Sequence, residues 1–249
     1  MAPPLKLYSV PASHPAAAVE AALRLKGIEY KRVDLPNLSQ RVVVRMVAGG
    51  GTVPAIKFDG QALVGSRPIM RRLDELKADP PLFPADPERR AAVEAAEEWG
   101  DEVLQRVVRR ITIHGVKRAP AAAALSLVPD DAQLPLPKAL QRFFAPPVVA
   151  MSARINNADE KTVKEDLRAL PGHLDKVDAW IAEGVLGGDI PNAADLQIGS
   201  SLRLLNRVHD VRPLLAGRPC MVLAERYFPP HQGDIPAGTY PAEWLPAAG

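Results

Sequence analysis

Apolar and polar residues alternate with two different periods along the first third of the chain, and these periods predict strands and helices in turn. Residues 5–9 (LKLYS) show the period of two that is typical of a strand, and residues 28–35 (IEYKRVDL) read as a second strand. Between them, Ala18, Ala22 and Leu25 share one face of a helix. A helix that connects two strands predicts that the strands pair in parallel.

A β-hairpin and two more helices complete this region. Residues 39–47 are compatible with a short helix, and residues 66–77 place their apolar side chains on one helical face. Residues 52–58 and 62–64 are two short apolar runs around an Asp-Gly pair, which is a strong hairpin signal. The predicted order of elements is therefore β-α-β-α-β-β-α.

Strand signals stop after a proline-rich linker at residues 78–87, and three helices are predicted beyond it. The first covers residues 88–115. The second, residues 163–182, repeats apolar positions at intervals of four and three, although Pro171 is expected to kink or split it. The third, residues 192–208, is apolar on most sides and is expected at the centre of a helical domain.

Two stretches of the second half are rich in proline. Residues 119–147 are interpreted as an irregular excursion with a short helix near 138–145, and the last 21 residues as an extended tail packed over the surface. We predict two domains: an α/β domain over residues 1–78, and an all-α domain with a proline-rich tail over residues 88–249.

Composition excludes several kinds of function. The 249 residues carry a net charge of +2, which does not suggest a nucleic-acid partner. A single cysteine, Cys220, excludes an internal disulfide and a cysteine-rich zinc site, and the five histidines are scattered, so no metal is expected. Cys220 lies in an apolar helical context and is interpreted as a core residue. No long apolar run predicts a membrane span and no secretory signal precedes the first strand, which favours the cytoplasm.

Three motifs in a fixed order carry a resemblance to a known family. They are residues 7–15 (LYSVPASHP), where a strand leads into a helix, residues 52–54 (TVP), and residues 190–195 (IPNAAD), which can cap the central helix. Asn192 and Asp195 suit such a cap, and we assign both to folding. With the predicted order of elements, these motifs resemble the soluble glutathione transferases of the serine-dependent, theta-like class.

The resemblance implies a thioredoxin-like N-terminal domain, an all-helical C-terminal domain, and a site between them. It places the thiol-activating hydroxyl at Ser13, and it implies a cis proline at Pro54 with Val53 pairing to the backbone of a thiol peptide. Gly65 and Ser66 fall where the family holds the other end of that peptide, at a helix N-terminus. It further implies a homodimer formed through the third and fourth helices.

A hydroxyl at position 13 can supply the free energy that thiol activation requires. A free thiol has a pKa of about 8.5, and lowering it by about 2 units takes roughly 2.7 kcal/mol. A hydrogen bond to a charged acceptor contributes ~1.5–3 kcal/mol, and a helix N-terminus adds ~0.3–1 kcal/mol. The alternative is that Ser13 only caps its helix. Tyr8, inside the strand, is assigned to packing, and Ser9 remains a rival hydroxyl.

Two features leave the chemistry of the substrates open. The family usually has an acidic residue or glutamine where Gly65 stands, and Arg67 has the wrong charge to replace it, so the thiol is glutathione or another low-molecular-weight thiol. A basic helical face, made by Arg106, Arg110, His114 and Lys117, is either a wall for an anionic substrate or a complement to the helix dipole, and we favour the dipole.

The resemblance favours an enzyme of the glutathione-transferase type, which presents an activated thiol to a small electrophile. Two alternatives stay open: a non-catalytic binding or scaffold protein with this fold, and a thiol-dependent isomerase or dehalogenase.

Overall fold

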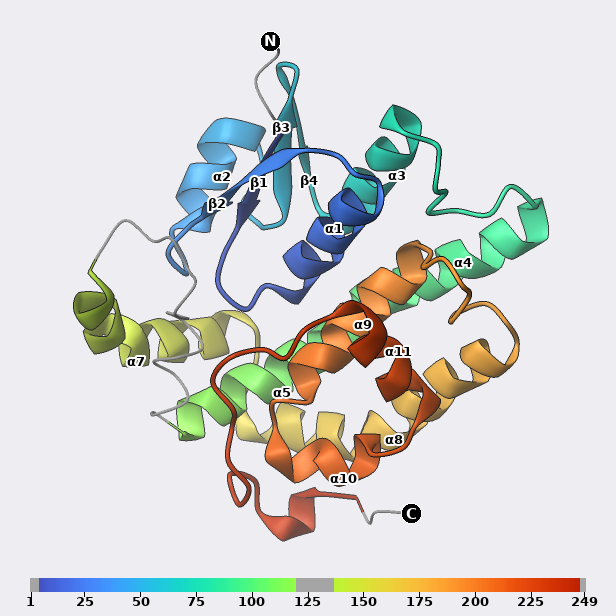
Figure 1. The fold of residues 1–249 in the computed structure, drawn as a ribbon. Helices are drawn as coiled ribbons and strands as arrows, with labels where there is room; N and C mark the ends of the chain where they lie inside the picture. The colour runs from blue at the N-terminus through green and yellow to red at the C-terminus, as the bar shows by residue number, and fades with distance from the viewer. Residues whose placement is uncertain (1–4, 120–136, 247–249) are drawn as a thin grey trace.

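The N-terminal part of the protein is built on a four-stranded sheet. The computed structural model describes residues 5–119 and 137–246. The sheet has the order β2-β1-β3-β4 (Figure 1), from strands β1 (Leu5–Ser9), β2 (Tyr30–Asp34), β3 (Ala55–Phe58) and β4 (Gln61–Val64). Strands β1 and β2 are parallel, whereas β3 is antiparallel to both β1 and β4. The predicted parallel pair and the predicted hairpin are both confirmed.

Helices cover both faces of this sheet (Figure 1). They are α1 (His14–Leu25), α2 (Gln40–Ala48) and α3 (Ser66–Leu76). Leu7 and Ile56 pack in the same core as residues of α1 and α3, whereas Tyr8 packs with Val44 of α2 on the other face. Alternating strand positions thus serve two cores. Tyr8 is buried, in agreement with its predicted packing role.

The long helix predicted at residues 88–115 is divided by a π-helical turn. It comprises α4 (Pro87–Trp99), the turn η1 (Gly100–Leu104) and α5 (Gln105–Arg118). Gly100 lets another helix approach closely, because a Cβ atom there would lie 2.8 Å from Cγ1 of Ile198.

Two further helices are longer than predicted. Helix α7 spans Lys138–Ile155, so the short helix expected near 138–145 extends well beyond it; residues 120–136 of the predicted excursion lie outside the described residues. Helix α8 spans Glu160–Ala182 and contains Pro171 in its interior. The expectation that Pro171 splits this helix is wrong. Its apolar stripe from Val163 to Val177, which includes Leu167 and Leu174, is buried, and this packing outweighs one lost backbone hydrogen bond.

Helix α9 (Ala193–Leu205) is the centre of the C-terminal half, as predicted. It contacts α1, α4, α5 and α11 (Pro219–Tyr227), and nearly all of its residues are buried. Its N-terminus is a capping box: the Asn192 side chain accepts from backbone N–H groups of the first turn, and the Asp195 carboxylate accepts from the Asn192 N–H at 2.9 Å. The predicted folding role of this pair is confirmed, and Cys220 is fully buried.

The C-terminal segment packs more tightly than a surface tail. After the short helical turns η2 (His209–Val211) and α10 (Arg212–Leu215), Ile235 pairs with Val208, and Tyr240 and Trp244 are buried. The last turn, η3, covers Ala242–Trp244.

The linker between the halves is anchored by a buried lysine. Lys26, at the end of α1, is 0% exposed, and its Nζ donates to Asp74 Oδ1 at 2.8 Å and to the backbone carbonyls of Lys77 and Pro80. One continuous core contains side chains of both halves, so the division into residues 1–78 and 88–249 stays a prediction.

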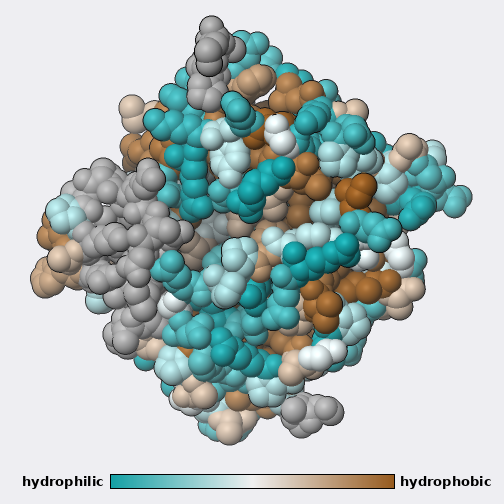
Figure 2. Space-filling model, viewed as in Figure 1, coloured by the Kyte–Doolittle hydropathy of each residue, from teal (hydrophilic) through white to brown (hydrophobic). Residues whose placement is uncertain are grey.

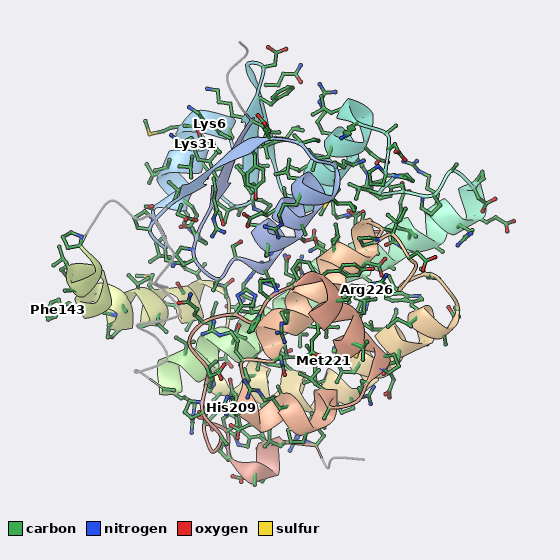
Figure 3. All side chains as sticks on the ribbon, in the orientation of Figure 1. Lys6, Lys31, Phe143, His209, Met221 and Arg226 are labelled. Atoms are coloured by element: carbon green, nitrogen blue, oxygen red, sulfur yellow. The ribbon has the colours of Figure 1, made fainter. Side chains whose placement is uncertain are left out.

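The face of the molecule in Figure 2 is mostly hydrophilic, with apolar side chains between the polar ones. Phe143 projects outward from α7 at one edge (Figure 3) and is 76% exposed. Within the described residues, no helix combines the length and the apolar composition that crossing a bilayer requires.

Candidate active site

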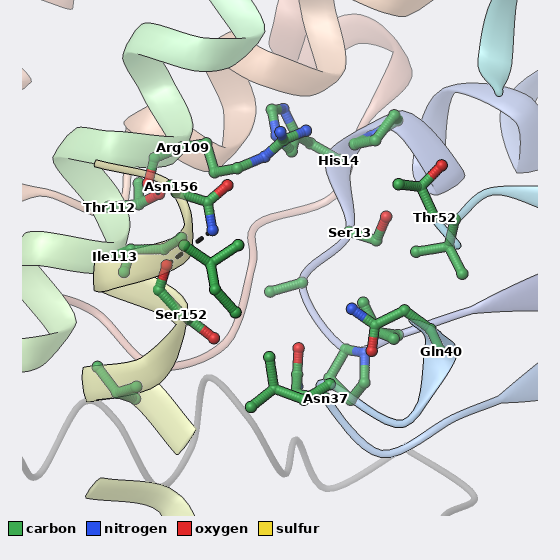
Figure 4. A pocket seen from close by; sticks show the side chains of 18 of the residues that line it. Ser13, His14, Asn37, Gln40, Thr52, Arg109, Thr112, Ile113, Ser152 and Asn156 are labelled. Atoms are coloured by element: carbon green, nitrogen blue, oxygen red, sulfur yellow. Dashed lines mark hydrogen bonds between the residues drawn. The ribbon is translucent and has the colours of Figure 1, made fainter. Parts of the chain in front are cut away.

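A cavity of about 240 Å³ lies between the sheet domain and the helical domain. One side is formed by the loop from β1 to α1, by residues 37–41 and by residues 51–53 (Figure 4). The opposite side is formed by α5 and α7, through residues such as Arg109, Ile113 and Asn156. The cavity therefore lies where the resemblance placed the site.

Ser13 lies at the N-terminus of α1 and lines this cavity (Figure 4). It is the N-cap of α1: its hydroxyl oxygen accepts from the backbone N–H of Ala16 at 3.4 Å. Ala12 turns the chain into the helix with a φ of +58°. Because the capping bond uses a lone pair of the oxygen, the hydroxyl proton stays available to donate into the cavity. Capping and thiol activation are therefore compatible at Ser13.

Val53 lines the same cavity, and its peptide bond to Pro54 is cis, as predicted. Strand β3 begins at Ala55, so Val53 precedes the hydrogen-bonded ladder of the sheet. The Pro54 carbonyl accepts from the Gly65 N–H at 2.9 Å, which ties this segment to the start of α3.

The structure does not place every predicted site residue in the cavity lining. Gly65 is the N-cap of α3 with a φ of +97°, a conformation that glycine adopts without strain, and Ser66 is buried in the first turn. Ser9, the rival hydroxyl, is buried and donates to the Val10 carbonyl at 3.2 Å, so its proton is already used. Among the predicted residues, Ser13 and Val53 share the cavity.

His14 is a site residue that the sequence analysis did not identify. It is buried, and its Nδ1 lies 3.0 Å from the hydroxyl oxygen of Ser201. Since the Ser201 hydroxyl donates its own proton to the Gln197 carbonyl, we assign Nδ1 as the donor and Nε2 as the unprotonated nitrogen. Nε2 is buried without a hydrogen-bond partner among the described residues. Burial, with the charge of Arg109 as a smaller cause, holds the pKa of His14 well below its usual value, so the imidazole is neutral at pH 7.

The charged side chains in the described lining of the cavity are all cationic. Three arginines, Arg41, Arg109 and Arg207, contribute to the described lining, and none of the described lining residues carries a carboxylate. Burial lowers the pKa of Arg109, and it lowers the pKa of Arg207 to about 10, which leaves Arg207 charged at neutral pH. An anion in the cavity meets attraction and no like charge from these side chains.

The basic face predicted on α5 is not the face that lines the cavity. Arg110 makes two hydrogen bonds of 2.6 Å to the Asp166 carboxylate, and His114 is buried and stacks on the ring of Tyr240. The hypothesis that these residues form a wall for an anionic substrate is thus wrong. The sequence favoured the alternative, a complement to the helix dipole. Arg109 points to the cavity instead, and the sequence signal that marks its face is the run Thr112, Ile113, Val116 at helical spacing.

Comparison with known proteins agrees with this architecture. Residues 7–81 match the family model of the glutathione S-transferase N-terminal domain. A probable maleylacetoacetate isomerase of Caenorhabditis elegans is 36% identical over 91 residues, which is 36% of this chain and 42% of that protein. The chain thus spans less than half the length of this curated relative.

Solved structures extend the likeness to nearly the whole fold. A glutathione transferase from Populus trichocarpa superposes with a TM-score of 0.62 at 18% identity, over 89% of this chain and 92% of that one. A glutathione S-transferase from Methylobacterium radiotolerans, solved in complex with glutathione sulfonate, gives a TM-score of 0.57 at 18% identity, over 94% and 95% of the two chains.

Together these findings identify the fold. The chain carries a glutathione S-transferase N-terminal domain with a thioredoxin-like sheet, followed by an all-helical domain, and its overall fold is that of the glutathione S-transferases.

Proposed function

We propose that this protein is a serine-dependent, theta-like glutathione S-transferase that activates a low-molecular-weight thiol for attack on a small electrophile. The observation that carries the proposal is the position of Ser13. Its hydroxyl stands at the N-terminus of α1 and faces a cavity whose described lining contains three arginines and no carboxylate. A thiolate is the charged species that such surroundings stabilise.

The reaction follows from this arrangement. The thiol loses its proton to solvent, and the sulfur anion accepts a hydrogen bond from the Ser13 hydroxyl. The N-terminus of α1 and the arginines add attraction for the negative charge. The thiolate then attacks the electrophilic carbon, the new carbon–sulfur bond forms, and the leaving group departs with the electron pair of its bond to carbon.

The thiol is proposed to lie along Val53 as a short strand, with its far end at the N-terminus of α3. There Pro54 holds the backbone in place, and Gly65 and Ser66 offer backbone and hydroxyl groups rather than a charge. The family match supports glutathione, and one structural neighbour binds glutathione sulfonate. Because Gly65 has no side chain, another small thiol is the alternative.

An isomerase is the second candidate, and the curated relative named as a probable maleylacetoacetate isomerase favours it. The same thiolate adds to one carbon of a cis double bond, the resulting single bond rotates, and elimination of the thiolate restores a trans double bond. No atom is gained or lost overall, so the thiol is a catalyst in this reaction and a substrate in conjugation.

We further propose a cytoplasmic homodimer formed through α3 and α4. A scaffold protein without catalysis is the alternative to an enzyme, and activity with a thiol separates the two.

The test is glutathione-dependent turnover of a neutral aromatic halide by the wild-type protein and three variants. Ser13→Gly removes the hydroxyl but caps a helix almost as well as serine. Ser13→Thr keeps a hydroxyl, and Ser9→Ala removes a neighbouring hydroxyl whose proton is already bonded. We expect Ser13→Gly to lower kcat/KM by about 10- to 100-fold, in keeping with one lost hydrogen bond to a charged group. Ser13→Thr and Ser9→Ala are expected to stay within a few-fold of wild type. Equal rates for the wild type and Ser13→Gly contradict the proposal.

A further inference from the structure

Arg109 is a half-buried cation of the cavity without an ion-pair partner among the described residues. Its side chain makes no ion pair or hydrogen bond with any residue in the ranges 5–119 and 137–246. The carboxylate of Asp101 offsets only part of the effect of burial, and the pKa of Arg109 is lowered on balance. On the same helix, the neighbouring Arg110 has its own carboxylate, Asp166.

Such an arrangement is costly unless a ligand completes it. A charge that is partly removed from water and has no counter-ion costs folding free energy. The position of Arg109 in the wall of a cavity therefore points to an anion that enters from outside.

The surroundings of Arg109 define the kind of anion. His14 lies close enough for the charge of Arg109 to act on it, yet it is neutral and presents a lone pair at Nε2, so it adds no second cation. One guanidinium offers paired N–H donors that match the two oxygens of a carboxylate. The remaining wall near Arg109 is partly apolar, with Ile113 and Val116 of α5. This combination suits a small acid with an apolar or unsaturated body.

We propose that the electrophilic substrate of this protein is a carboxylic acid whose carboxylate pairs with Arg109. The proposal rests on the function proposed above and specifies its acceptor. The carboxylate is assigned to the acceptor and not to the thiol peptide, because Arg109 comes from α5, on the wall opposite Thr52, the residue that precedes Val53 (Figure 4).

The test compares a charged and a neutral acceptor of nearly the same shape, chloronitrobenzoate and its methyl ester, with glutathione as the thiol. Arg109→Gln removes the charge, and Arg106→Gln is the matched control, since Arg106 is exposed on the same helix. We expect Arg109→Gln to raise KM for the acid by about 10- to 100-fold, while KM for the ester changes less than about threefold. The KM values of Arg106→Gln for the acid and for the ester are expected to equal those of the wild type. An equal loss for acid and ester overturns the proposal, and a raised KM for glutathione assigns Arg109 to the thiol instead.

A second measurement is independent of catalysis. Calorimetric titration with nitrobenzoate and with nitrobenzamide, without thiol, compares the wild type, Arg109→Gln and Arg109→Met. We expect the wild type to bind the acid at least tenfold more tightly than the amide, and both variants to lose this preference. We also expect the thermal midpoint of Arg109→Met to equal or exceed that of the wild type, because the unpaired charge is gone. If the wild type binds the acid more tightly than the amide but turns over neither acceptor, the proposed transferase activity is contradicted and the carboxylate site is not. Wild-type protein without preference for the acid contradicts the carboxylate site, whatever its activity.

Discussion

The imidazole Nδ1 of His14 donates to the Ser201 hydroxyl oxygen over 3.0 Å, and this bond joins the first turn of α1 to the middle of α9. His14 follows Ser13 directly in the chain. The contact therefore fixes the candidate catalytic hydroxyl relative to the helical wall that carries Arg109, and it links the packing of the two halves to the geometry of the site.

Loss of this bond is expected to destabilise the protein. Ser201→Ala leaves the buried Nδ1–H of His14 without an acceptor, and we predict a decrease of about 1–3 kcal/mol in the free energy of unfolding. Ser200→Ala is the matched control, since Ser200 is equally buried and also donates to the Gln197 carbonyl but has no histidine partner. Urea denaturation of both variants measures the difference. Equal losses contradict the assigned role of the His14–Ser201 bond.

Substitution of Lys26, which anchors the linker, is expected to lower the free energy of unfolding more than the loss of an exposed ion pair does. The Lys26 Nζ is bonded to Asp74, Lys77 and Pro80 with no exposure to solvent, so Lys26→Met removes the cation beside Asp74, whose Oδ1 keeps only the Leu82 N–H, and leaves two carbonyls without their donor. We predict a loss of about 3–5 kcal/mol in the free energy of unfolding, as for a broken buried ion pair.

Arg72→Met serves as the surface control for this lysine. The Arg72–Glu75 pair is largely exposed, and its loss is expected to change stability by less than about 1 kcal/mol. A Lys26 variant as stable as the Arg72 variant contradicts the anchoring role. Chemical denaturation followed by circular dichroism makes the comparison.

The partial burial of His231 is expected to make the protein less stable in mild acid. Burial, and next the charge of Arg207, lowers the pKa of His231 from 6.5 to about 4, so the unfolded chain binds this proton more readily than the folded one between these values. Stability from this group is therefore complete above pH 6.5 and decreases as the pH falls towards 4, with a slope of at most about 1.4 kcal/mol per pH unit.

The variant His231→Gln isolates this contribution. Its free energy of unfolding is expected to depend less steeply on pH than that of the wild type within this window, whereas the two dependences run parallel at higher pH. Unfolding curves recorded across the window supply the test. Identical slopes for both proteins are the outcome that rules out titration of His231 as a cause.

Local patterns were sufficient to predict the framework of the fold. The period of two in β1, the Asp-Gly turn between β3 and β4, and the Asn192–Asp195 cap each depend on residues that are close in sequence. The same holds for Ser13, because an N-cap is defined by the helix that it begins. Such features need no knowledge of the tertiary structure.

The features that were missed depend on contacts between distant segments. Pro171 does not end α8, because burial of the stripe around it decides the outcome, and Lys26 looks like a surface residue until its partners at residues 74–80 surround it. On α5, charge marked the face of Arg110 as one candidate wall, whereas the cavity lies one position away at Arg109. Which face of a helix meets a cavity is set by the packing of its neighbours.

The central claim is that the Ser13 hydroxyl stabilises the thiolate of a bound thiol. The most direct measurement is the pKa of enzyme-bound glutathione, obtained from the ultraviolet absorbance of the thiolate as a function of pH in the wild type, Ser13→Gly and Ser9→Ala. We predict that the bound thiol has a pKa about 2 units below that of the free thiol in the wild type and in Ser9→Ala, and that Ser13→Gly raises it by about 1–2 units. A bound thiol with the same pKa in the wild type and in Ser13→Gly would contradict the account.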